Sequence, residues 1–186
     1  VTPQDHVDEY NVRFKDLWNK MNIGYDFFIR TTQEDHKSYV RKCLKNLFDK
    51  GEIYSEVYAG WYSVSEERFF GEEELVDGKD PISGKEVEWL EEKNYFFKMG
   101  QYQDRLIQHI ENNPGFIIPE FRANEILGFL KNDLRDLCIS RPKSRLEWGI
   151  PLPFDEEYVT YVWFDALINY VTAAGYSNEE KFNKYW

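Results

Sequence analysis

This 186-residue sequence has few basic residues, few cysteines and no long apolar run. Its 23 Lys and Arg face 34 Asp and Glu, a net charge of −11, which argues against the whole surface binding nucleic acid because phosphate contacts depend on cations. Any RNA contact must therefore be local. No apolar stretch approaches the roughly 18–20 residues of a membrane span, so no membrane association is predicted.

The two cysteines, Cys43 and Cys138, lie far apart in apolar surroundings. This pattern favours buried thiols in a reducing compartment over a disulfide. The beginning of the sequence does not resemble a signal peptide. We therefore expect a cytoplasmic location.

The first 54 residues are predicted to be helical. Apolar residues recur at helical spacing from Val7 to Met21, and a second stripe runs from Val40 to Phe48 and ends at Gly51. Both stripes are interpreted as core. From residue 52 the period becomes two, which predicts strands near 52–58 and 61–65 joined by a turn at Ala59 and Gly60.

The middle of the chain is predicted to hold a turn-rich loop (71–93) with a strand at 87–90, and then helices at 101–112 and 119–132. The inward faces of these helices are expected to include Leu106 and Ile110 in the first, and Ile126 and Leu130 in the second. In YVWFDALINY (161–170), aromatic and β-branched residues predict a buried strand through Phe164, followed by a helix capped by Asp165.

That last segment is preceded by ISRPKSR (139–145) and WGIPLP (148–153). Together with YDFFIRTTQEDH (25–36), GEIYSEVYAGWYSVSEERFF (51–70) and NYFFKM (94–99), it resembles the class I aminoacyl-tRNA synthetases, and within them the methionyl-tRNA synthetases of bacterial and organellar type. The likeness extends over almost the whole chain. The Ala166-Leu167 pair favours methionine, since the related valine and isoleucine enzymes usually have Ser and Gly there.

The resemblance implies an α/β fold class with an α+β insertion, the connective peptide, within a doubly wound nucleotide-binding fold. It divides the chain into a helical catalytic part (1–54), the insertion (55–145) and a return to the catalytic domain (146–186). The family's His-Ile-Gly-His-like and Lys-Met-Ser-Lys-Ser-like motifs are missing from these 186 residues. We therefore expect a central piece of the enzyme, inactive by itself.

Residue roles follow from the resemblance at matching positions. A methionine pocket is implied at Trp163, Ala166, Leu167 and Tyr170, although many bacterial relatives have proline in place of Leu167. A flexible thioether gains from contact with aromatic rings. Arg141 matches an arginine that stabilises charge during adenylate formation; a structural ion pair is its alternative role. Asp165 is interpreted as structural.

The insertion of many relatives holds zinc with a Cys-x-x-Cys and Cys-x-x-His set. Here the matching positions are Ser63, Glu66, Asp80 and Ser83, and two serines with two carboxylates suit tetrahedral zinc poorly. No zinc is expected. A hard cation such as calcium at Glu66 and Asp80 is a weaker alternative.

The implied substrates and partners are L-methionine, ATP as its Mg²⁺ complex and the acceptor end of tRNA(Met). Two alternatives stay open. A synthetase for valine, isoleucine or leucine would need a large editing domain, for which residues 55–145 are too few. A non-catalytic binding module derived from the same fold would use exposed aromatic residues to bind a protein, and the same residues would favour self-association.

Overall fold

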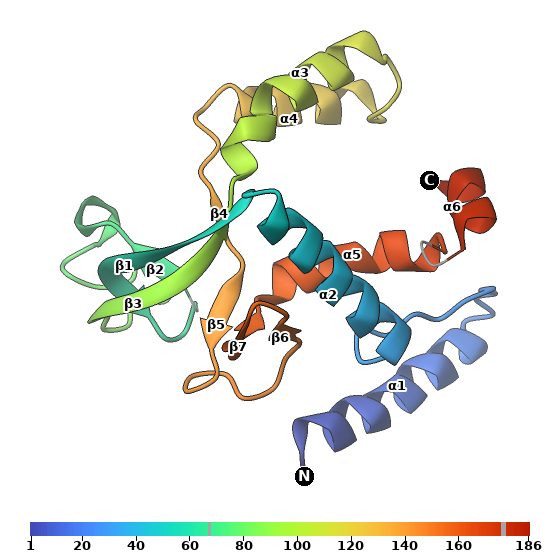
Figure 1. Ribbon diagram of the computed structural model, residues 1–186, viewed down its shortest axis with the longest axis horizontal. Helices are drawn as coiled ribbons and strands as arrows, with labels where there is room; N and C mark the ends of the chain where they lie inside the picture. The colour runs from blue at the N-terminus through green and yellow to red at the C-terminus, as the bar shows by residue number, and fades with distance from the viewer. Residues whose placement is uncertain (67, 176–177) are drawn as a thin grey trace. The chain divides into compact units, whose positions relative to one another are not determined.

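The computed structural model describes residues 1–66, 68–175 and 178–186 (Figure 1). The chain divides into two compact units. The first combines Val1–Asn46 with Arg141–Trp186, and the second consists of Leu47–Ser140. Each unit mixes helices with a small sheet, so the two are treated separately below.

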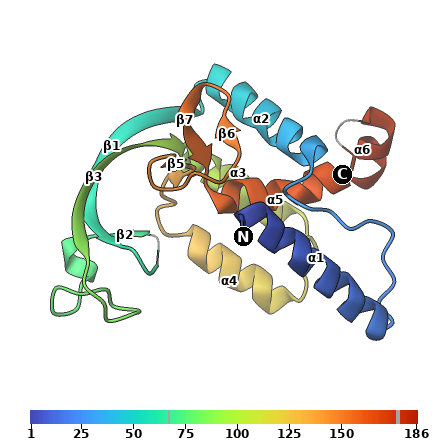
Figure 2. The same ribbon diagram turned by 90° about the horizontal axis from the view of Figure 1, so that it is seen from below.

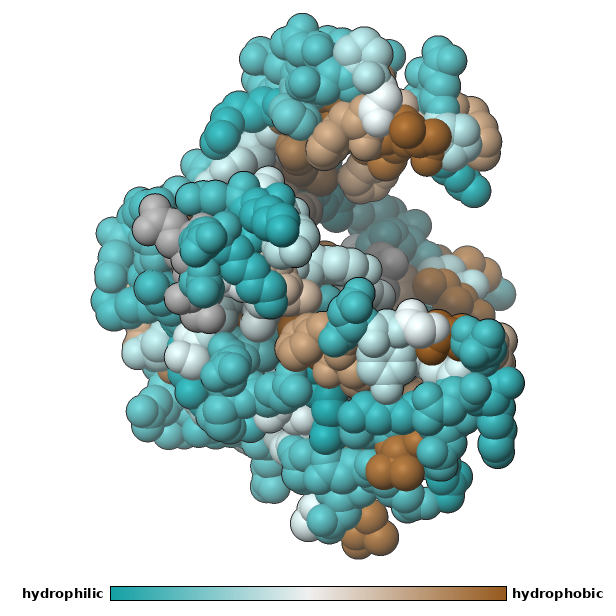
Figure 3. All heavy atoms as spheres, turned by 90° about the vertical axis from the view of Figure 1, so that its right-hand side faces the viewer, coloured by the Kyte–Doolittle hydropathy of each residue, from teal (hydrophilic) through white to brown (hydrophobic). Residues whose placement is uncertain are grey.

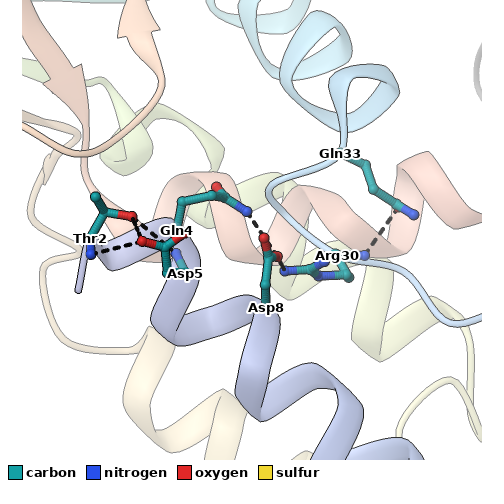
Figure 4. A network of polar contacts seen from close by, with 6 residues as sticks. All are labelled: Thr2, Gln4, Asp5, Asp8, Arg30 and Gln33. Carbon is teal, nitrogen blue, oxygen red and sulfur yellow. Dashed lines mark hydrogen bonds and ion pairs between the residues drawn. The ribbon is translucent and has the colours of Figure 1, made fainter.

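The first unit begins with helix α1 (Pro3–Lys20), which confirms the predicted helix. A capping box starts it, because the Thr2 hydroxyl accepts a hydrogen bond from the Asp5 amide at 3.1 Å and the Asp5 carboxylate accepts from the Thr2 amide at 3.1 Å. Arg30 pairs with Asp8 and thereby ties the segment after the helix to its first half (Figure 4).

The apolar stripe of α1 is not core, contrary to the prediction. No residue of this helix is buried. The stripe is covered only in part: Val7 and Trp18 are half-buried, and the Trp18 ring packs against Tyr25 and Phe28. Periodicity alone reports amphipathicity without saying what packs against the helix. The large side chains left exposed are Tyr10, Phe14, Leu17 and Met21.

The core of the first unit lies around helix α2 (Glu34–Asp49) and a small sheet of order β5-β7-β6. Here the stripe prediction is confirmed for Val40 and Leu44, both fully buried. The strands are β5 (Ser140–Pro142), β6 (Pro151–Leu152) and β7 (Asp155–Thr160), followed by α5 (Val162–Ala173) and α6 (Glu179–Tyr185). Buried apolar residues here are Leu152 in β6, Val159 in β7 and Ile150, which comes just before β6.

The second unit is built on an antiparallel sheet of order β2-β1-β3-β4. Its strands are β1 (Ile53–Ser63), β2 (Arg68–Phe70), β3 (Glu88–Phe97) and β4 (Leu137–Cys138), with a short 3₁₀ helix η1 (Glu72–Glu74). The pair β1 and β3 forms a long curved ribbon (Figure 2).

The predicted turn at Ala59-Gly60 is wrong. Both residues stay in the ladder, where Ala59 pairs with Glu91 and Gly60 with Leu90. Because β3 offers a continuous partner from Glu88 to Phe97, ladder hydrogen bonds hold these small residues extended despite their weak strand propensity. The chain turns only after Ser63.

The remaining helices of the second unit confirm their predicted positions. They are η2 (Met99–Tyr102), α3 (Gln103–Asn112) and α4 (Glu120–Leu130). Ile110 and Leu130 are buried as predicted, whereas Leu106 and Ile126 are 43% and 41% exposed. Two helices alone cover only part of each other's apolar stripe. The face of the molecule in Figure 3 carries several apolar patches on a largely hydrophilic surface.

Cys43 and Cys138 lie on α2 and β4, and no disulfide joins them. Both are half-buried rather than buried, which corrects the predicted degree of burial. Within the described ranges, no helix combines the length and the apolar character needed to cross a bilayer.

Candidate functional site

The junction between β7 and α5 positions the side chains singled out by the sequence. Strand β7 ends at Thr160, Tyr161 is the N-cap with φ −70° and ψ 140°, and the helix begins at Val162. The strand predicted through Phe164 is therefore too long. The carbonyl of Tyr161 accepts hydrogen bonds from the amides of Phe164 and Asp165 at 3.1 and 3.4 Å, and these bonds override the β propensity of the segment.

Asp165 does not cap the helix, contrary to the prediction. The N-cap is Tyr161, and Asp165 comes later, at the end of the first helical turn. Its carboxyl group is partly buried, and burial raises its pKa to about 6. Desolvation disfavours the charged form, and the sequence pattern did not indicate this burial.

The four residues predicted to form the methionine pocket share one face of α5. Their spacing of three, four and seven residues from Trp163 places them in one stripe of a 3.6-residue helix. Trp163, Leu167 and Tyr170 are 59%, 60% and 64% exposed, and Ala166 is half-buried. The stripe is therefore an accessible apolar surface rather than part of the unit's core.

A cavity of about 380 Å³ opens on the neighbouring side of the same helix, within the first unit. Of the predicted site residues, Ala166 borders it. Its other apolar walls include Trp148, Ile150 and Val162, and the charged groups Lys37 and Asp165 line it as well. Apolar walls with a few polar groups are typical of small-ligand sites, and this cavity offers one cation and one acid.

A steric constraint explains why glycine follows Trp148 next to this cavity. A Cβ atom at position 149 would lie 2.9 Å from the Cβ of Val159, and Val159 is fully buried in β7. Only glycine allows the 146–150 segment to pass this close to the strand. The sequence singled out the pair as a motif but not its packing.

Arg141 lies in β5, and its guanidinium carbon is 4.1 Å from the ring centroid of Tyr161. The contact has the geometry of a cation–π interaction. It places a permanent positive charge beside the residue at which α5 begins. The N-terminus of a helix also favours anions, so Arg141 and α5 together make this end of the helix electropositive.

His36 is fully buried on α2, although the sequence assigned it no role. Its Nδ1 lies 3.1 Å from the hydroxyl oxygen of Thr172 on α5. Burial lowers the pKa of the imidazole, so the ring is neutral at physiological pH. This contact joins α2 to the helix that carries the predicted pocket.

In the second unit, the predicted zinc-knuckle positions are joined by hydrogen bonds. The Asp80 carboxylate is buried and accepts from the Ser63 hydroxyl and from the amides of Ile82 and Ser83, the latter two at 2.7 and 3.1 Å. Glu66 takes part through its backbone amide, which donates to Ser63 at 3.3 Å. In the described ranges, no three His, Cys, Asp or Glu residues cluster as metal ligands would.

The chain as a whole is similar to known proteins. The model of the family described as tRNA synthetases class I (M) matches residues 1–82 and 71–186. Methionine–tRNA ligases from Clostridium acetobutylicum and Bacillus cereus are 54% and 49% identical over the whole of this chain. The chain spans 29% and 30% of their lengths.

Solved structures of a methionyl-tRNA synthetase are also similar to this chain. Mycobacterium tuberculosis methionyl-tRNA synthetase bound by methionyl-adenylate superposes with a TM-score of 0.80 and 43% identity. The match covers 93% of this chain and 35% of that one. It confirms the predicted fold class, a mixture of helices and sheets matching part of a synthetase.

Proposed function

The chain belongs to the class I tRNA synthetases (M), and we propose that it is the central part of a methionine–tRNA ligase. The observation that carries this proposal is similarity along the whole chain, at about half identity, to proteins of that name. The protein that contains this chain activates L-methionine with ATP, taken as its Mg²⁺ complex, and works in the cytoplasm. It then transfers the methionyl group to the acceptor end of tRNA(Met).

In the first step, an oxygen of the methionine carboxylate attacks the α-phosphorus of ATP and pyrophosphate leaves. Charge builds up on the phosphate oxygens in the transition state, and fixed cations directed at that charge lower the barrier. Arg141 supplies such a cation beside the start of α5. We assign it the catalytic role.

The exposed stripe of α5 supplies the wall for the methionine side chain. Trp163 and Tyr170 offer aromatic faces, and sulfur–ring contacts contribute roughly 0.3–1.5 kcal/mol each. Ala166 leaves space between them, and Leu167 completes the apolar surface. Their exposure in this chain supports a role in contacting something outside the unit's own core.

The insertion, residues 55–145, is proposed to be structural and free of zinc. Ser63, Glu66, Asp80 and Ser83 do not fit a zinc ion, because serine is a poor ligand and the buried Asp80 carboxylate already accepts hydrogen bonds. The second unit has twenty acidic and ten basic residues, a net charge of −10. Contacts to tRNA phosphates are therefore expected mainly on the remainder of the protein.

Pyrophosphate exchange tests the proposal. The complete protein that contains this chain is assayed with each standard amino acid in turn, and methionine alone should stimulate exchange. The 186-residue chain by itself should show none. Stimulation by valine, isoleucine or leucine would change the substrate, and no exchange with any amino acid would favour the non-catalytic binding module.

A further inference from the structure

His36 and Thr172 connect α2 to the side of α5 that lies opposite the proposed methionine pocket. Successive residues of a helix are about 100° apart, so Thr172 is about 180° from Trp163 around the axis. His36 is fully buried, and its Nδ1 is 3.1 Å from the Thr172 hydroxyl oxygen. Helix α5 thus carries an exposed apolar stripe on one side and a buried polar anchor on the other.

Further polar contacts surround this pair. The Thr172 hydroxyl also lies 3.2 Å from the carbonyl oxygen of Ile168, one turn earlier in the same helix. The backbone of Asp165, which also belongs to α5, interacts with the imidazole as well. The buried ring therefore meets α5 at two places, the Thr172 hydroxyl and the Asp165 backbone.

A buried hydrogen bond restricts both position and rotation. If α5 rotated about its axis, the Thr172 oxygen would move away from Nδ1 and leave the nitrogen of the fully buried ring without this partner, a costly outcome. An apolar contact at the same place would tolerate such a rotation. The same rotation would turn Trp163 and Tyr170, on the far side, away from their orientation.

We propose that His36 is a positioning residue for methionine recognition, acting through the hydrogen bond between its Nδ1 and the Thr172 hydroxyl to set the rotation of α5 and hence the pocket wall. This inference rests on the proposed function. His36 does not contact substrate; it acts through the helix. A residue that served only the stability of the core would change the folded fraction without altering the affinity for one substrate.

The test compares two pairs of variants in the complete protein. His36→Leu removes the ring nitrogen at similar volume, whereas His36→Asn keeps an amide that can donate or accept near the position of Nδ1. Thr172→Val removes the hydroxyl with its shape preserved, whereas Thr172→Ser retains the hydroxyl. Pyrophosphate exchange gives kcat and the separate KM values for methionine and ATP, and thermal unfolding reports the folded fraction.

We expect His36→Leu and Thr172→Val each to raise KM for methionine about tenfold, the effect of one lost hydrogen bond, while KM for ATP stays within about twofold. His36→Asn and Thr172→Ser should restore most of the methionine affinity. The double variant His36→Leu with Thr172→Val should be no worse than either single one, because both remove the same bond.

An unchanged KM for methionine in Thr172→Val would overturn the inference even if His36→Leu failed to fold. Parallel increases in both KM values would do the same. A wild-type protein that shows no methionine-dependent exchange would instead overturn the proposed function. The wild-type assay therefore separates the two failures.

Discussion

The guanidinium of Arg141 stacks on the ring of Tyr161, with 4.1 Å between the guanidinium carbon and the ring centroid. Tyr161 is also the N-cap of α5, so its backbone is fixed by the turn from β7 into the helix. The proposed catalytic cation is thereby held against a rigid element. This relationship leads to the first prediction.

Tyr161→Leu should lower kcat/KM for pyrophosphate exchange about fivefold to tenfold. The reason is the loss of a cation–π contact worth roughly 1 kcal/mol, together with a less well-oriented guanidinium. Tyr161→Phe keeps the ring and should retain most of the activity. Equal activity in the Leu and Phe variants would show that the ring does not orient Arg141.

Trp163→Ala should raise KM for methionine about tenfold, because an indole face and its sulfur contact are lost. Trp89→Ala is the matched control, since Trp163 and Trp89 are 59% and 60% exposed and Trp89 lies in the other unit. Steady-state exchange measured against methionine distinguishes them. Similar effects of both substitutions would argue against a specific wall at Trp163.

Asp165→Asn should stabilise the protein at pH 7.5 and leave its stability nearly unchanged at pH 4. The pKa of Asp165 is raised to about 6 from 3.8, so the folded state binds the proton first as pH falls. The stability gained on protonation is fully present below pH 3.8 and is lost as pH rises through 6. Two pKa units set a ceiling of about 3 kcal/mol, which solvent around the partly exposed group reduces.

Thermal unfolding between pH 4 and 7.5 measures this difference, and Asp133→Asn, at an exposed position, is the control. A melting-temperature difference between Asp165→Asn and the wild type that stays constant across this range would contradict the prediction.

Asp80→Asn should loosen the loop at 71–87 at neutral pH. Burial alone would raise the pKa of Asp80, but hydrogen bonds from Ser63, Ile82 and Ser83 outweigh it and lower the pKa to about 2. The ionised group contributes stability above pH 3.8, and that contribution disappears as pH falls through 2. Limited proteolysis at pH 7 should therefore cleave the variant several times faster, on the order expected for a lost charge-assisted network.

Asp77→Asn provides the control in the same loop. Asp77 has φ 51°, a conformation that asparagine tolerates, and its side chain is exposed. Its cleavage rate should match the wild type. A cleavage rate for Asp80→Asn equal to that of the control would refute a structural role for the buried carboxylate.

Leu44→Ala should cost about 2–5 kcal/mol of unfolding free energy, because Leu44 is fully buried and the substitution leaves a cavity. Leu17→Ala, on the exposed stripe of α1, should cost less than about 1 kcal/mol. Urea unfolding of both variants measures the contrast. Comparable losses would mean that the α1 stripe is covered in solution.

Local spacing was enough to predict several elements. Helical periodicity identified α1, α2, α3 and α4, and the segments ISRPKSR, WGIPLP and YVWFDALINY were enough to suggest the family. These features depend on side chains within one or two turns of each other or on a motif read in order. Neither requires knowledge of what packs against the segment.

The sequence by itself indicated the family, most of the helical segments and, through the family resemblance, the four residues proposed to bind methionine. Tertiary structure decided that Ala59-Gly60 stays in a ladder, that α5 begins at Val162, and that the α1 stripe is exposed. It also decided that Asp165 and His36 are desolvated and that Arg141 meets Tyr161. The physical reason is that strand partners, burial and ring contacts join residues far apart in the chain, and no local spacing encodes them.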